Sequence, residues 1–180
     1  MTFRQLATGT LLFIAACTRS FSPIEPSAAV EEEQAVYRAI LDDMGREGKI
    51  VVVIPDSTVN YNLMPSTQLL EKLPGLQVET LANFNLVNRT PVPLQLPTGT
   101  AVRYYLVPQS EIPPILELRT KFPDASAIVH FSRVGFNREK TQALIYRSTY
   151  WGPLAAVGEL LLLSRKNEWQ VTAAALLWIS

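Results

Sequence analysis

The last third of this 180-residue chain limits the fold most, because four segments in it each have the composition of a β-strand. They cover residues 126–136, 141–151, 158–165 and 169–179. Short polar turns at 137–140 and 166–168 join the first and last pairs, and Gly152-Pro153 joins the middle pair. Strands connected this closely lie antiparallel to each other. The pattern therefore predicts a four-strand antiparallel meander.

The region before these strands predicts several helices and a buried strand. Residues 31–44 open with Glu31-Glu32-Glu33, which suits the positive end of a helix dipole, and carry a one-sided apolar stripe with Asp42-Asp43 on the solvated side. The β-branched run at 50–54 is typical of a strand buried on both faces. Shorter helices are expected at 66–73 and 78–87 and after Pro113-Pro114, and a strand at 101–107. We expect an α+β fold with a mostly antiparallel sheet, ending in the meander, and helices packed on one face.

The bulk composition fits one ordered domain and argues against nucleic acid as a partner. Hydrophobic residues make up 48% of the chain and charged residues 18%. The 16 basic and 16 acidic residues cancel. A nucleic-acid binder needs a cationic surplus to displace counterions from phosphates. We therefore expect a single globular domain over residues 30–180 and no nucleic-acid partner.

The first 17 residues, MTFRQLATGTLLFIAAC, have the organisation of an export signal. Arg4 supplies a positive charge, and residues 6–16 form an apolar stretch well short of the roughly 20 residues that a spanning helix needs. The stretch ends in Ile14-Ala15-Ala16-Cys17, which resembles the lipobox of bacterial lipoproteins. The resemblance implies cleavage after Ala16, diacylglycerol on the Cys17 sulfur, and a further acyl chain such as palmitate on the new amino group.

Cys17 is the only cysteine of the chain, which agrees with lipid attachment. A lone free thiol is unusual in an exported protein, whereas an acylated sulfur is not. Several acyl chains anchor firmly, since each buried CH₂ contributes about 0.8 kcal/mol. The alternatives are an ordinary secretory signal or a short buried helix with an incidental cysteine.

These observations predict three segments: a signal peptide at 1–16, the lipidated cysteine with a Ser-, Pro- and Ala-rich tether at 17–29, and the domain at 30–180. The protein is then expected at the cell envelope, with the membrane as its partner through the lipid. In a Gram-negative lipoprotein, Thr18 in place of aspartate favours the outer membrane, facing the periplasm.

A second resemblance covers about 45 residues near the C-terminus. The segment VGFNREKTQALIYRSTYWGPL, a following Gly-Glu strand, KNEWQV and a terminal LWIS are similar to a group of uncharacterised bacterial proteins. In that group cysteines often flank the Gly-rich bend, whereas the bend here, Trp151-Gly152-Pro153-Leu154-Ala155, has none. The resemblance supports the meander and implies no activity.

The chain shows no motif for catalysis, a cofactor or a metal. His130 is the only histidine, so a Ser-His-Asp or Cys-His arrangement would depend on it. A zinc site would need several His or Cys ligands, and no Gly-rich phosphate loop occurs. We expect no cofactor and no metal. We also favour a non-catalytic protein over an enzyme. A hydrolase that pairs distant carboxylates stays open, with these candidates: Glu111, Glu117, Asp124 and Glu159.

One group of polar residues predicts a possible pocket. Asp56 and Ser57, followed by Thr58, come directly after the buried strand, and strand ends often line pockets. Arg133, Tyr146 and the adjacent arginine at 147 could supply donors there. The alternative is that the Asp and Ser only form a turn. We expect a module that binds an envelope protein or a small ligand, with the hydrolase and an assembly factor as the alternatives.

Overall fold

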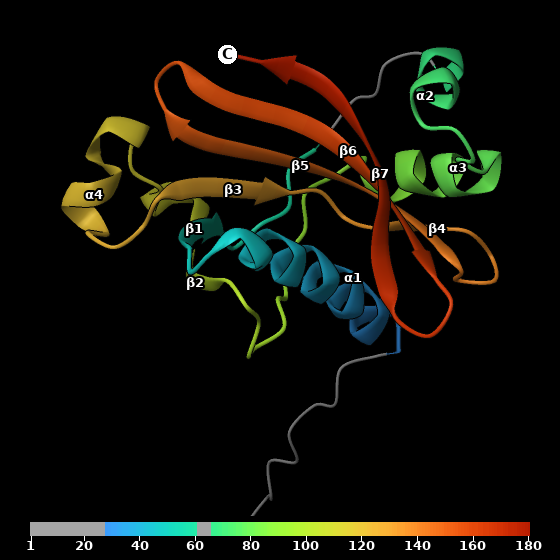
Figure 1. Ribbon diagram of the computed structural model, residues 1–180, viewed down its shortest axis with the longest axis horizontal. Coiled ribbons are helices and arrows are strands. Elements are labelled where there is room, and N and C mark those ends of the chain that lie inside the picture. The colour runs from blue at the N-terminus through green and yellow to red at the C-terminus, as the bar shows by residue number, and fades with distance from the viewer. Residues whose placement is uncertain (1–27, 61–65) are drawn as a thin grey trace, which may run out of the picture.

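The computed structural model describes residues 28–60 and 66–180, which form one seven-stranded sheet with helices around it (Figure 1). The strands are β1 Val51–Pro55, β2 Arg103–Val107, β3 Ala127–Phe131, β4 Gly135–Phe136, β5 Gln142–Gly152, β6 Ala155–Arg165 and β7 Trp169–Ile179. The α-helices are α1 Ala28–Met44, α2 Ser66–Lys72, α3 Val78–Val87 and α4 Leu118–Lys121, and 3-10 turns lie at Gly45–Glu47, Gln109–Glu111 and Ile115–Glu117. None of the described helices is long and apolar enough to cross a bilayer. The signal peptide, Cys17 and the tether up to residue 27 lie outside the described residues, and the last two residues assigned to the tether belong to α1.

The sheet is mixed, so the expectation of a mostly antiparallel sheet was wrong. Its order is β2-β1-β3-β5-β6-β7, with β4 pairing to β5 off this path. β1 runs parallel to both β2 and β3, whereas β3–β5, β5–β6 and β6–β7 are antiparallel. Long crossovers separate β1 from β2 and β2 from β3, and only such connections allow parallel neighbours.

The segment 126–136, expected as one strand, forms the two strands β3 and β4. Asn88, at the end of α3, explains the interruption. Its side-chain oxygen accepts a hydrogen bond from the Arg133 backbone N–H at 2.7 Å, and its nitrogen donates to the Arg133 carbonyl at 3.1 Å. These two bonds take the Arg133 backbone out of the strand ladder.

Helices cover both faces of the sheet, so the expectation that they pack on one face was also wrong. α1 packs on one side, against Ile145 and Leu161 among others. α2 and α3 pack on the opposite side, against Leu144 and Leu160. Successive residues of β5 and β6 are buried, and because neighbouring side chains in a strand point to opposite faces, both faces need a cover.

α1 is held on the sheet by an apolar stripe and by charges in its first turns. Val36, Tyr37, Ile40 and Leu41 are all buried, as the sequence pattern predicted. The Tyr37 ring packs against Phe131 with the ring centres 5.6 Å apart. The acidic residues at its start form ion pairs with the sheet: Glu32 with Arg165 at 2.6 Å, and Glu33 with Arg133 at 2.5 Å.

Candidate functional site

The four residues predicted to form a polar pocket lie in different places. Asp56 and Ser57 form a turn: Asp56 Oδ1 accepts a hydrogen bond from the Gln109 backbone N–H at 3.0 Å, and Ser57 forms a β-bridge with Pro93. Arg133 lies on the α1 side of the sheet. Tyr146 lies on the opposite side, in the cluster beneath α2 and α3. The structure therefore does not bring these four residues together.

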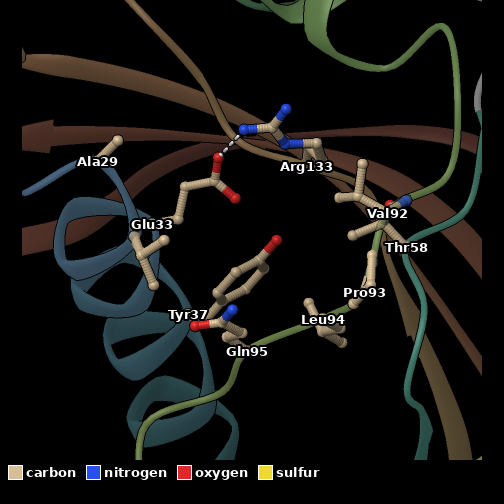
Figure 2. Close-up of a pocket in the computed structure, with 10 residues that line it drawn as sticks. Ala29, Glu33, Tyr37, Thr58, Val92, Pro93, Leu94, Gln95 and Arg133 are labelled. Atoms are coloured by element: carbon tan, nitrogen blue, oxygen red, sulfur yellow. Dashed lines mark hydrogen bonds and ion pairs between the residues drawn. The ribbon is translucent and has the colours of Figure 1, made fainter. Parts of the chain in front are cut away.

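Arg133 does line a pocket of about 240 Å³ with Thr58, which we call the Arg133 pocket (Figure 2). It lies where β1 and β3 end, and the first turns of α1 and the connector 92–95 form its other walls. Figure 2 shows Glu33 and Arg133 meeting across its rim, with the Tyr37 hydroxyl pointing toward them from below. Glu33 is 100 residues from Arg133, so no local pattern in the sequence could pair them.

The polar groups of the Arg133 pocket mainly hold the fold together. Arg133 Nη2 donates to Glu33, the Tyr37 hydroxyl donates to the Ser132 carbonyl at 2.9 Å, and Thr58 Oγ1 accepts from the Val92 N–H at 3.0 Å. Burial raises the pKa of the Tyr37 hydroxyl well above its usual value; the negative charge of Glu33 adds to this and Arg133 opposes it. Tyr37 is therefore a fixed proton donor near neutral pH. Arg133 Nε is buried and has no hydrogen-bond partner among the described residues.

His130 lies in β3, where its ring meets Tyr150 edge-on at 5.5 Å. Burial lowers the pKa of the imidazole below its usual 6.5. The folded state then disfavours the proton more than the unfolded state does, so the stabilisation is complete above about pH 6.5 and is lost as pH falls through the folded-state pKa. A structural role beside Tyr150 explains this residue without catalysis.

We expect the urea concentration at the unfolding midpoint to decrease as the pH is lowered from about 7.5 to 5.5. The His130→Gln variant should lose most of this pH dependence. Carboxylates mostly titrate below this window, so His130, the only histidine in the chain, is isolated by it. The measurement is a set of urea melts followed by circular dichroism at four pH values. Equal slopes in both proteins would show that His130 does not titrate on unfolding.

A second cavity, of about 410 Å³, has the character of a ligand site, and we call it the Trp151 groove. Its floor is apolar and consists of Met44, Ile50, Val52 and Ala127. It lies on the α1 side of the sheet, just beyond the residue where α1 ends. Ligand sites usually occupy about 300–1,000 Å³, with an apolar lining and a few convergent polar groups.

β5 supplies one wall of the Trp151 groove through alternate residues. Arg147 and Thr149 are two positions apart, so their side chains share a face of the strand. Trp151 lies where the β5–β6 register shifts, between Tyr150 and Gly152, and it lines the same groove. The Trp151 side is open to solvent, because this residue is 54% exposed. Trp151 therefore presents apolar surface both to the cavity and to the solvent.

An ion pair forms the polar wall of the groove. Arg147 and Glu159 face each other in the β5–β6 ladder, and their side chains are only 17% and 16% exposed. Glu159 Oε1 accepts hydrogen bonds from Arg147 Nη2 at 2.6 Å and from Nε at 3.1 Å. Asp43, at the end of α1, also lines the groove and pairs with Arg46 at 3.1 Å. Because the Arg147–Glu159 pair is largely buried and held by two hydrogen bonds, these two side chains lose little entropy in binding.

The sequence showed part of this site, but it did not predict that Trp151 and Asp43 line a common groove. The alternation of Arg147 and Thr149 was visible in the sequence, but Trp151 was interpreted as the last residue of a strand and the first of the Gly-rich bend. Asp43 was interpreted as a solvated residue. Its place beside β5 depends on how α1 crosses the sheet, which no local pattern gives.

The acids considered for a hydrolase do not converge. Glu111, Asp124 and Glu159 each form an ion pair with a different partner, and Glu117 lies in a 3-10 turn. The pairs are Lys121–Glu111 at 3.7 Å, Arg103–Asp124 at 2.9 Å and Arg147–Glu159 at 2.6 Å. Within residues 28–60 and 66–180, no three His, Cys, Asp or Glu side chains are grouped as a metal site would need.

Comparison with known proteins adds no relative to this picture. No protein-family model matches the chain, and neither a curated protein nor a solved structure is significantly similar to it.

Proposed function

We propose that the chain is a lipoprotein of the cell envelope, anchored through lipid on Cys17, whose domain binds a ligand in the Trp151 groove. The observation that carries the binding role is the exposed Trp151 beside a pre-formed ion pair, above an apolar floor. The lipobox resemblance at Ile14–Cys17 carries the location. We propose binding and not catalysis in the groove, because both acids that line it are already paired with arginines.

The groove lies at the end of α1 that is farther along the chain from Cys17. The helix begins at Ala28 and ends at Met44, which lines the groove. A 17-residue helix is about 25 Å long. The 11 steps from residue 17 to residue 28 can span at most about 40 Å. A tether with a reach greater than the length of α1 lets the domain turn the groove away from the membrane surface.

The anchor is tested by the Cys17→Ser variant, labelled in cells with a clickable fatty acid. We expect the label to disappear completely and an unprocessed precursor about 16 residues longer to accumulate, because serine has no sulfur for the glyceride. Thr18→Ser is the matched control and should keep both labelling and processing. Labelling that survives in Cys17→Ser would contradict lipid attachment.

An assembly role is the second candidate, and β7 is the observation that favours it. β7 is the edge strand next to β6. It is 11 residues long and has no charged residue or proline. Such an edge can pair with a strand of another protein. Two register shifts in the β6–β7 ladder interrupt it, however, and irregularities of this kind discourage pairing. We therefore rank this role below ligand binding.

A further inference from the structure

We propose that the ligand of the Trp151 groove is a neutral sugar ring, part of an envelope glycan or of a free oligosaccharide. This inference rests on the proposed binding function and adds the chemical class of the ligand. It follows from three properties of the groove: an exposed indole, side chains that both donate and accept hydrogen bonds, and balanced charge.

The indole of Trp151 suits the apolar face of a sugar. A pyranose ring has C–H groups on one face and hydroxyls around its rim, so it needs a flat apolar surface with polar groups beside it. Trp151 provides that surface, because it is 54% exposed and at the same time lines the cavity. Amphipathic aromatic residues are favoured wherever one side of a ligand is apolar and the other is hydrated.

The ion pair suits the hydroxyl rim. A hydroxyl both donates and accepts, so it can accept from a guanidinium and donate to a carboxylate at the same time. Arg147 uses Nε and Nη2 on one oxygen of Glu159, and no described residue bonds to Arg147 Nη1 or to Glu159 Oε2. Hydrogen bonds to charged groups are about twice as strong as neutral ones, which favours recognition of this rim.

The charged side chains that line the groove are all engaged in ion pairs, so a charged ligand would find no unpaired partner there. The two acids, Asp43 and Glu159, are each paired with an arginine, at 3.1 Å and 2.6 Å. A charged ligand would have to compete with the Arg147–Glu159 pair, whose side chains are mostly shielded from water. A neutral ligand can bond to both side chains and leave the pair intact. The cavity of about 410 Å³ is within the usual range for small-molecule sites.

The test uses the full chain, purified from membranes in a detergent without a sugar headgroup, and isothermal titration calorimetry. The probes are the N-acetylglucosamine trimer, maltotriose, and the controls cyclohexanol, hexylamine and hexanoate. We expect at least one trisaccharide to bind, with an affinity that hardly changes when salt is raised from about 0.05 to 0.5 M, because a neutral ligand is not screened. Trp151→Ala should weaken binding at least tenfold and Asp43→Ala several-fold.

Leu86→Ala is the matched control for Trp151→Ala. Leu86 is 57% exposed, close to the value for Trp151, and lies on α3, which covers the opposite face of the sheet. This variant should bind the trisaccharide like the wild type. Trisaccharide binding that survives in Trp151→Ala would overturn the inference.

The control probes separate failure of the sugar from failure of the binding function. If cyclohexanol, hexylamine or hexanoate binds and the trisaccharides do not, and Trp151→Ala abolishes that binding, the sugar assignment is wrong and the groove remains a ligand site. If none of the five probes binds, both the sugar assignment and the proposed role of the groove are contradicted.

Discussion

Gly135→Leu is expected to leave the protein unable to fold, with loss of soluble material and of the cooperative unfolding transition. A Cβ atom at Gly135 would overlap the backbone and Cβ of Phe84, in the middle of α3. The overlap involves backbone atoms of a helix, which cannot move aside as the end of a side chain can. α3 and β4 would have to separate, and the cost exceeds the 1–3 kcal/mol typical of milder overpacking. This free-energy cost is therefore a large part of the roughly 5–15 kcal/mol that stabilises a domain.

Gly152→Ala is the matched control for this substitution. A Cβ at Gly152 would come no closer than 3.8 Å to the Ala155 Cβ, which is ordinary van der Waals contact. We expect the unfolding free energy of this variant to stay within about 0.5 kcal/mol of the wild type. The two variants are compared by urea melts followed by circular dichroism. A cooperative transition in Gly135→Leu with an unchanged midpoint would contradict the close packing of α3 on β4.

Phe131→Ala is expected to reduce the unfolding free energy by about 3–5 kcal/mol, the usual cost of emptying a fully buried aromatic site. Phe131 has no exposed surface and packs against Tyr37, which itself is bonded through its hydroxyl to the Ser132 carbonyl. The cavity would therefore open between α1 and β3, where the ring joins the helix to the sheet.

The comparison for this variant is Leu154→Ala, at a position that is 87% exposed in the turn after β5. It should change stability by less than about 0.5 kcal/mol. A loss below 1 kcal/mol in Phe131→Ala, with an unchanged dependence on denaturant, would show that this contact does not hold α1 on the sheet.

Local patterns in the sequence predicted the elements well where they depend on neighbours in the chain. The helix at 78–87 begins and ends as expected, and three residues of the run at 50–54, Val52, Val53 and Ile54, are buried in β1. The α+β class followed from these elements. The parallel pairing of β1 did not, because long crossovers return a strand to either side of its partner and leave no trace in local composition.

The covering of both faces of the sheet, in contrast, was predictable from the sequence. The successive leucines at 160–163 in β6 indicate burial on both faces, and this could have predicted helices on both sides. Strand alternation also separates the predicted pocket residues: Tyr146 and Arg147 are adjacent in sequence and therefore face opposite sides. A pocket that contained both was excluded by that rule alone. The ion pair between Glu33 and Arg133, in contrast, depends on the complete fold.

The location of the protein depends most directly on the chemistry of one sulfur atom. We would extract the mature chain from membranes with detergent, digest it, and measure the mass of its N-terminal peptide. The peptide is expected to begin at Cys17 and to carry the mass of a diacylglyceryl group together with an N-linked acyl chain. A free thiol on Cys17, or a peptide that still contains residues 1–16, would contradict the lipid anchor.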